Sequence, residues 1–423
     1  MVINSLEHQL KSILRNSLGY SRSTRFCQKL SDLDYLYLHL QRVLGVYSSG
    51  REYLQERNES GDHKEIARAT YFGSLHSTRR SRMARESANG VYRMIGKELQ
   101  NTGVDHLKKF SELNEYEIIS FDGHYRTHAC HASKDSKDRY RAVGGIYGMN
   151  MRNGLIQSLV TTDFETNKKH ELRAFKEYFR MNPFSDKKVI SIVDMAYWDA
   201  KFWQTAKRSK ADENETYIIT LMKENLAPIK EIPLNFDKEH AYNIGVESVT
   251  KVTFKSKASA TKIVYRDPET KKEYVYLTTL GSEIQPGLIA HLYLWRWKIE
   301  KVFNVFKSKL KELKAWADGE TSEDAQAAII SIAYNFLVRT QDYSLAKEGV
   351  FEIKLAQKQK KIIANRSKSA TKKGHFLHPL VQIPHKLYQM SAQFIRCFRN
   401  NYKRGLPWPH LISIFEQAML RYL

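Results

Sequence analysis

The chain has few cysteines and no long apolar run. Its three cysteines, Cys27, Cys130 and Cys397, lie far apart in the 423 residues. Such a sparse set excludes a disulfide framework and fits a reducing cytoplasm. No run approaches the roughly 18 apolar residues of a membrane helix, and the first residues contain no apolar signal core. We therefore expect a cytoplasmic protein without a membrane partner.

Acidic residues are also scarce relative to basic ones. The chain has 68 Lys and Arg against 46 Asp and Glu, which gives a net charge of +22. The excess runs through the whole chain, so it belongs to the molecule and not to one tail. A cation of this size predicts salt-dependent binding to nucleic acid. A basic ribosomal or membrane-surface protein is the alternative, but the sequence has no lipid-anchor motif or basic amphipathic terminal helix.

The first part of the chain, residues 1–113, is polar and basic, with a helical pattern. Within it, residues 76–97 hold a cluster of arginines with Ser and Thr, and Glu86 is the single acid there. Side chains of these types supply phosphate contacts. We expect an N-terminal DNA-binding region, with a solvated helix face as the alternative. The candidate DNA-binding residues are Arg79, Arg80, Arg82 and Arg85.

A period-two pattern begins near residue 116 and predicts β-structure. Residues 117–129 read as a strand with an Asp, and a hairpin pair, a helix over 171–181 and a second Asp-bearing strand over 187–199 follow. A later helix, which Asp318-Gly319 is expected to end, carries a Glu. By analogy, this order is that of a ribonuclease-H-like α/β fold, a mixed five-stranded sheet with helices.

The remaining segments complete the predicted organisation. We expect the catalytic core in two parts, 114–213 and 282–345, separated by a β-rich insertion over 214–281. Residues 346–423 form a basic and helical C-terminal region suited to dimer or DNA contact. Within that region, 354–375 is nearly free of acids, which indicates a flexible DNA-contacting segment or a surface loop.

The segment YLWRWKIEKVFNVFK, residues 293–307, has four different polar side chains on one face. On a helix that turns about 100° per residue, Tyr293, Arg296, Glu300 and Lys307 share an arc of roughly 60°. The adjoining arc is apolar and suits a core. One acid among phosphate-binding groups indicates chemistry on a polyanion.

Three acids are candidates for that chemistry. Asp122 and Asp194 lie on predicted strands, where Asp is disfavoured, and Glu300 lies on the polar helix face. Phosphodiester cleavage needs an activated hydroxyl and charge neutralisation, which two Mg²⁺ ions held by carboxylates supply. Together these acids predict a two-metal site.

These residues resemble a known family. The spacing of Tyr293, Arg296, Glu300 and Lys307 matches the YREK signature of the DDE transposases of bacterial insertion sequences, in particular insertion sequence family four. Asp194-Met195-Ala196-Tyr197 is similar to the second-acid pattern of that family, and SFDGH around Asp122 is similar to its first-acid strand. The resemblance covers roughly 116–340, and the β-rich stretch falls where the family has its insertion.

The resemblance implies roles for these residues. Asp122, Asp194 and Glu300 would bind two Mg²⁺ ions, which Mn²⁺ can replace, and Tyr293, Arg296 and Lys307 would hold phosphates, with Lys311 extending the contact. It also implies cut-and-paste transfer of inverted-repeat ends into target DNA by a homodimer in a bacterial, nucleoid-associated setting.

Some alternatives stay open. A ribonuclease-H-like nuclease without strand transfer shares the acids, and a non-catalytic DNA-binding protein derived from a transposase shares the charge. In some members of that family a Trp of the insertion stacks on a flipped base during hairpin formation. The β-rich stretch of this chain has no Trp, so a DNA hairpin intermediate is not implied. One group of residues suggests either zinc or polar contacts near DNA, without the spacing of a common zinc module: His124, His128, Cys130 and His131.

Overall fold

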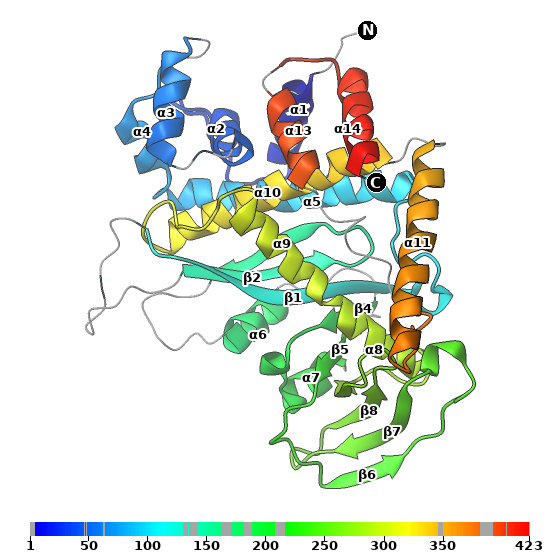
Figure 1. Ribbon diagram of the computed structural model, residues 1–423. Coiled ribbons are helices and arrows are strands. Elements are labelled where there is room, and N and C mark those ends of the chain that lie inside the picture. The colour runs from blue at the N-terminus through cyan, green and yellow to red at the C-terminus, as the bar shows by residue number, and fades with distance from the viewer. Residues whose placement is uncertain are drawn as a thin grey trace.

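A nine-stranded sheet dominates the part of the chain that the structure describes (Figure 1). The structure is a computed structural model, and it describes residues 5–45, 47, 49–61, 64–129, 134, 143–161, 171–181, 188–207, 216–345, 350–380, 392–402 and 404–422. The strand order is β3-β2-β1-β4-β5-β9-β8-β7-β6. The strands are β1 (Tyr116–Arg126), β2 (Val143–Asn150), β3 (Ile156–Thr161), β4 (Lys188–Ile192), β5 (Thr216–Leu221), β6 (Lys230–Pro233), β7 (Val246–Thr253), β8 (Ser259–Arg266) and β9 (Glu273–Thr278).

Three neighbouring strands in the middle of the sheet run parallel. β1 pairs with β4, and β4 pairs with β5, in parallel, while β2 and β3 complete an antiparallel hairpin beside β1. The first predicted strand, the hairpin and the helix over 171–181 are confirmed as elements, whereas the second Asp-bearing strand is shorter than predicted, since β4 ends at Ile192 and Asp194 lies beyond it. Because parallel strands share their carboxyl ends at one edge, residues that follow β1 and β4 lie near each other.

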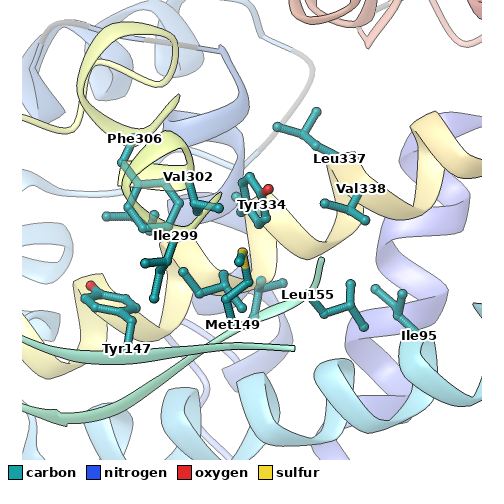
Figure 2. Packing of buried hydrophobic residues seen from close by; sticks show 14 of the residues in the cluster. Ile95, Tyr147, Met149, Leu155, Ile299, Val302, Phe306, Tyr334, Leu337 and Val338 are labelled. Atoms are coloured by element: carbon teal, nitrogen blue, oxygen red, sulfur yellow. The ribbon is translucent and has the colours of Figure 1, made fainter. Parts of the chain in front are cut away.

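The sheet is covered on both faces, and alternate residues of each strand point to opposite faces. On one side Ile119 and Phe121 pack with Phe175 of α6 (Glu171–Met181) and Trp203 of α7 (Ala200–Lys207). On the other side, β2 packs beneath α9 (Trp297–Ser308), α10 (Glu320–Leu345) and α5 (Thr78–Asn101). Figure 2 shows this second core, formed by apolar residues of those helices and the sheet: Ile95, Tyr147, Met149, Leu155, Ile299, Val302, Phe306, Tyr334, Leu337 and Val338.

The chain before β1 is helical, as predicted. Its long helix α5 lies beside α10, and the smaller helices sit on that pair (Figure 1). The C-terminal helices include α14, which lies in the region predicted to be helical. No helix in the described part of the chain combines the length and apolar character needed to cross a membrane. The helices of these regions are α1 (Leu6–Leu18), α2 (Asp32–Gly45), α3 (Gly50–Glu59), α4 (Arg68–Ser74), α11 (Val350–Lys372), α13 (Ala392–Tyr402) and α14 (Trp408–Tyr422).

The predicted β-rich stretch consists of strands, but it continues the sheet. β5 pairs in parallel with β4 and antiparallel with β9, and β8, β7 and β6 follow outward from β9. The strand that begins the predicted insertion therefore belongs to the parallel middle of the sheet. Sequence patterns do not show this, because strand pairing depends on contacts between distant segments.

Two helix predictions are wrong. The segment 293–307 is not one regular helix, because α8 (Pro286–Trp295) and α9 meet at Arg296. There the amide of Arg296 donates to Tyr293 and the amide of Ile299 donates to Arg296, so the turn closes with tighter i→i−3 bonds. The helix also ends at Ser308 and not near Asp318, since Lys311 has a left-handed φ of 62°.

The third correction concerns the basic C-terminal stretch. Residues 354–375 are neither a loop nor irregular for most of their length, because α11 spans Val350–Lys372. Lys, Ala and Gln are strong helix formers, so the local propensity favours a helix even without a clear apolar face. Figure 1 shows α11 reaching from the C-terminal helices toward the β7–β9 part of the sheet.

Candidate active site

Two of the predicted acids belong to neighbouring parallel strands, since Asp122 lies within β1 and Asp194 lies two residues after the end of β4. In the β1–β4 pair, Ser120 lies opposite Ile192. Asp122 lies two residues beyond Ser120, and Asp194 lies two residues beyond Ile192, so both acids lie at the same end of this strand pair. His124 lies on the same face of β1 as Asp122, since side chains alternate, and its ring stacks on Phe303 of α9. The strand register thus directs Asp122 toward the α8–α9 pair.

Arg296 joins the first acid to the third. Its Nη1 donates to Asp122 Oδ2 at 3.1 Å, and its Nη2 donates to Glu300 Oε1 at 3.0 Å. The guanidinium also lies over the Tyr293 ring, 5.6 Å from its centroid. Its side chain is nearly buried, whereas the two carboxylates remain partly exposed. Three of the four residues of the predicted polar face therefore meet around Asp122.

Burial and charge set the protonation of this group. Burial raises the pKa of Asp122 to about 6, although Arg296 opposes that rise. Burial alone lowers the pKa of Arg296, but Tyr293, Asp122, Glu300 and Asp194 raise it above its usual value, so it stays charged. Burial raises the pKa of Tyr293 to about 12, so its phenol stays neutral. The negative charge of Asp194 raises the pKa of both Tyr293 and Arg296, so Asp194 lies close to this group.

The carboxylates of this group are suitable ligands for a divalent ion, but their positions in the structure do not form a metal site. Carboxylates are the ligands that Mg²⁺ prefers. Nevertheless, no three His, Cys, Asp or Glu side chains in the described ranges lie close enough to hold a metal ion. The reason is visible in the contacts of Arg296, whose positive charge occupies the space between Asp122 and Glu300. A metal held by these acids requires that guanidinium to turn away.

Lys307 lies near the end of α9, and Lys311 lies just beyond it. Both are exposed, Lys307 in the last turn of α9 and Lys311 in the loop that follows. That loop is tied to the end of β1, because the Thr127 amide donates to Leu313 and the Ala315 amide donates to Thr127, both at 3.0 Å. The loop therefore presents its lysines at the end of the strand that carries Asp122.

Two residues near the acids had no predicted role. Glu171 of α6 accepts a hydrogen bond from Tyr197 at 3.0 Å, and its charge also raises the pKa of Asp122. Trp297, next to Arg296, is 53% exposed, which is unusual for so large an apolar side chain. In the sequence, only the position of Glu171 at the start of the predicted helix distinguishes it, and that signal is weak. Only the exposure in the folded chain distinguishes Trp297 from a core aromatic.

The group around His124 is not a surface cluster. His124 is buried beneath Phe303, and burial lowers its pKa to about 3, so the ring is neutral. The expectation of a polar contact near DNA is wrong for this residue. His128 is half-buried, while Cys130 and His131 lie outside the described residues.

The four arginines of α5 have different surroundings. Arg79 makes two hydrogen bonds to Asp32, both of 2.8 Å, and Arg85 pairs with Asp324. Arg80 donates to the Leu30 carbonyl, and Arg82 is exposed. The local sequence lacks acids, but α2 and α10 supply them. The charge of Arg79 and Arg85 is therefore balanced inside the protein.

Comparison with known proteins gives a single family. None of the curated proteins matches the chain. The family model described as the transposase DDE domain matches residues 114–336, more than half of the chain. The matched region begins just before β1 and ends within α10, so it contains Asp122, Asp194 and Glu300. The chain therefore belongs to the transposase DDE domain family.

Proposed function

We propose that the protein is a DNA transposase that binds the inverted-repeat ends of an insertion sequence, cuts them and joins them to target DNA. One observation carries the proposal: Asp122 and Glu300, from β1 and α9, meet on the single guanidinium of Arg296 within the family-matched region. Such a convergence of acids from distant elements is typical of a reaction centre. The net charge of +22 favours a polyanionic substrate.

The three acids are the proposed metal ligands. Asp122, Asp194 and Glu300 would hold two Mg²⁺ ions, or Mn²⁺ in their place. When bound, such ions activate the attacking hydroxyl and neutralise charge on the phosphate. Asp122 is the proposed shared ligand, because it lies at the same end of the β1–β4 pair as Asp194 and shares Arg296 with Glu300. Glu171 places a further negative charge beside it and holds the Tyr197 hydroxyl.

The neighbouring side chains are the proposed phosphate ligands. Arg296 has a planar fork that suits two phosphate oxygens, and Lys307 supplies a point charge. Arg296 would exchange its carboxylate partners for a phosphate of the cleaved strand, which frees both acids. Tyr293 supports the guanidinium through its ring, and Lys311 extends the cationic surface along the DNA. This assignment corresponds to the YREK signature of insertion sequence family four.

The other proposed features follow from the same assignment. The parallel strands and the hairpin beside them would form a ribonuclease-H-like core, with β6–β9 as the inserted part. Pairing two transposon ends would require a homodimer. The helices before β1 would bind the transposon ends, because α5 has an exposed arginine, Arg82.

A joining assay tests the proposal. Purified protein, Mg²⁺ and labelled duplexes from the DNA that flanks its gene are incubated with an unlabelled target plasmid. We expect both cut ends and labelled DNA joined to the plasmid. Cut ends without joined product would indicate a nuclease, and binding without either product would indicate a non-catalytic DNA-binding protein.

Replacing Arg296 by Ala should separate its two proposed roles. Without Mg²⁺, the change leaves two carboxylates facing each other, so we expect the free energy of unfolding to fall by about 1–3 kcal/mol. DNA cleavage should also fall, whereas Mg²⁺ binding should persist. Thermal melting with and without Mg²⁺ measures the first effect, and Mg²⁺ should raise the Tm of the variant more than that of the unchanged protein.

The control for this variant is Arg173→Ala, which removes an arginine paired across one turn of α6 at the surface. It should leave the Tm and the Mg²⁺ response unchanged. An Arg296→Ala protein with unchanged stability and unchanged cleavage would refute both roles of that side chain.

Arg82 and Arg79 should behave differently in DNA binding. Because Arg82 is exposed, Arg82→Ala should reduce the slope of log Kd against log salt by about 1 without changing stability. Arg79→Ala leaves Asp32 without its guanidinium, so it should cost about 1–3 kcal/mol of stability and leave the slope unchanged. Fluorescence anisotropy at several salt concentrations provides the slopes. Equal slopes for Arg82→Ala and the unchanged protein would assign Arg82 to a solvated face.

A further inference from the structure

A cavity of about 480 Å³ lies in the helical region, away from the candidate active site. It is formed by residues 25–27, one face of α4 and the beginning of α5. Ligand pockets of proteins have volumes of about 300–1,000 Å³, so this cavity is large enough for a nucleotide-sized group. Figure 1 shows α4 and the beginning of α5 on the same side of the molecule as the loop after α9.

The lining of the cavity is cationic. Arg25, Arg79 and Arg80 contribute to it, and none of the described residues that line it is an Asp or Glu. Asp32, which is not among the lining residues, balances the charge of Arg79. Arg80 donates to the Leu30 carbonyl and lies over the Tyr35 ring, and although the charge of Asp32 also reaches it, the hydrogen bonds of that carboxylate go to Arg79. Arg25 is exposed at the rim. The cavity thus favours an anionic ligand.

An aromatic side chain stands at the same rim. Phe26 is 86% exposed, the largest exposed fraction among the large hydrophobic side chains that the structure describes. An exposed ring beside arginines matches the two parts of a nucleotide, because the ring stacks on a base and the guanidinium binds a phosphate. Thr70 and Ser77 add hydroxyl groups to the lining.

The walls of the cavity are fixed to neighbouring helices. Asp32 of α2 holds Arg79 of α5 with two hydrogen bonds. On the next turns of α5, Ser81 donates to Asp324 at 2.9 Å and Arg85 pairs with the same carboxylate. These contacts hold α5 against α10. The cavity therefore has a fixed place relative to the candidate active site.

We propose that this cavity binds one unstacked nucleotide of the DNA substrate, with its base against Phe26 and its phosphate on Arg25 and Arg80. The bases of an intact duplex have their faces covered by neighbours, so the ring can stack only on a nucleotide at a frayed, single-stranded or flipped position. The inference rests on the proposed function, since it takes DNA as the ligand. It adds a binding site for single-stranded DNA outside the acids and the α9 lysines.

Binding to two matched duplexes tests the inference. One is blunt, and the other carries a short single-stranded extension of a few nucleotides, and fluorescence anisotropy measures the Kd of each. The intact protein should bind the extended duplex about tenfold more tightly, because one stacked base contributes about that factor. Phe26→Ala should lose this preference and keep its affinity for the blunt duplex. Phe376→Ala, which removes an exposed ring elsewhere, should keep the preference.

A second variant fills the cavity without removing a contact. Gly73 lines it, and a Cβ at this position meets nothing within 4 Å, so Gly73→Leu should fold normally and block the nucleotide. We expect it to lose the preference as Phe26→Ala does. Arg25→Ala should weaken binding of the extended duplex more than of the blunt duplex, whereas Arg22→Ala, which removes the same charge from an exposed residue outside the lining, should weaken both equally.

The outcomes distinguish this inference from the proposed function. Equal affinity of the intact protein for both duplexes, or a preference that survives in Gly73→Leu, would overturn the inference while DNA joining still supports the function. If a free deoxynucleoside monophosphate displaced the extended duplex as effectively as a single-stranded oligonucleotide, the site would belong to free nucleotides and the inference would fail. Absence of any DNA binding would overturn the function itself.

Discussion

Glu300→Gln should lower the rate of DNA cleavage by about a thousandfold or more. Gln keeps the size of the side chain and an oxygen that can accept from Arg296, but it removes the negative charge with which Glu300 would hold a metal ion. A thousandfold loss corresponds to about 4 kcal/mol of transition-state stabilisation, a reasonable cost for losing one charged metal ligand. Binding to the DNA ends should not weaken, since Arg296 and Lys307, and not Glu300, are the proposed phosphate ligands. Cleavage of labelled duplex at saturating protein measures the rate.

The other two acids should behave in the same way. Asp122→Asn and Asp194→Asn should each give a loss of similar size, and combining two of the changes should add little, because the residues act as one unit. The matched control is Asp199→Asn. Asp199 follows Asp194 in the same segment, but it pairs with Lys176 and caps α7, so its cleavage rate should stay near that of the intact protein. Full cleavage by any one of the three variants would remove that residue from the site.

The sequence contains enough information for the strands and the acids, because each depends on a local pattern. Asp122 and Asp194 interrupt apolar, period-two stretches, and that conflict with strand propensity makes them conspicuous in the sequence alone. The spacing of the residues around Glu300 is local as well. The meeting of Asp122 and Glu300 on Arg296 is not local, since it depends on the register of β1 and on the tight turn between α8 and α9.

Two features that the sequence alone does not reveal share one physical cause, which is that the partner of the side chain is distant in the sequence. The arginines of α5 look unpaired next to Glu86, yet Asp32 and Asp324 reach two of them. His124 looks like part of a surface cluster until α9 covers it. α11 is a different case, because its composition favours a helix and only the charge run suggested a loop.

A buried ion pair behind the site should be the most costly contact to break. Arg126 of β1 pairs with Glu323 in the first turn of α10, and the two side chains are 0% and 1% exposed. Although burial by itself lowers the pKa of Arg126, the charge of Glu323 and a bond to the Tyr147 hydroxyl raise it above its usual range. Glu323→Ala leaves that charge buried without its carboxylate. We expect the free energy of unfolding to fall by about 3–5 kcal/mol, measured by urea denaturation.

The matched control is the exposed pair between Lys188 and Glu115. Glu115 is 78% exposed, so Glu115→Ala should cost less than about 1 kcal/mol. A cost of that small size for Glu323→Ala as well would show that the buried pair contributes little more than a surface pair.

Replacing both partners of the buried pair shows what the pair does beyond stability. The double change Arg126→Met with Glu323→Leu removes both charges and keeps apolar volume, so it should recover most of the lost stability. Arg126 lies on β1 two positions beyond His124 and on the same face as Asp122, and Glu323 fixes it to α10. If the pair positions the end of β1, the stable double variant should still cleave DNA more slowly than the intact protein. Equal cleavage rates would mean that packing alone places Asp122, and that the buried charges add only to the specificity of the fold.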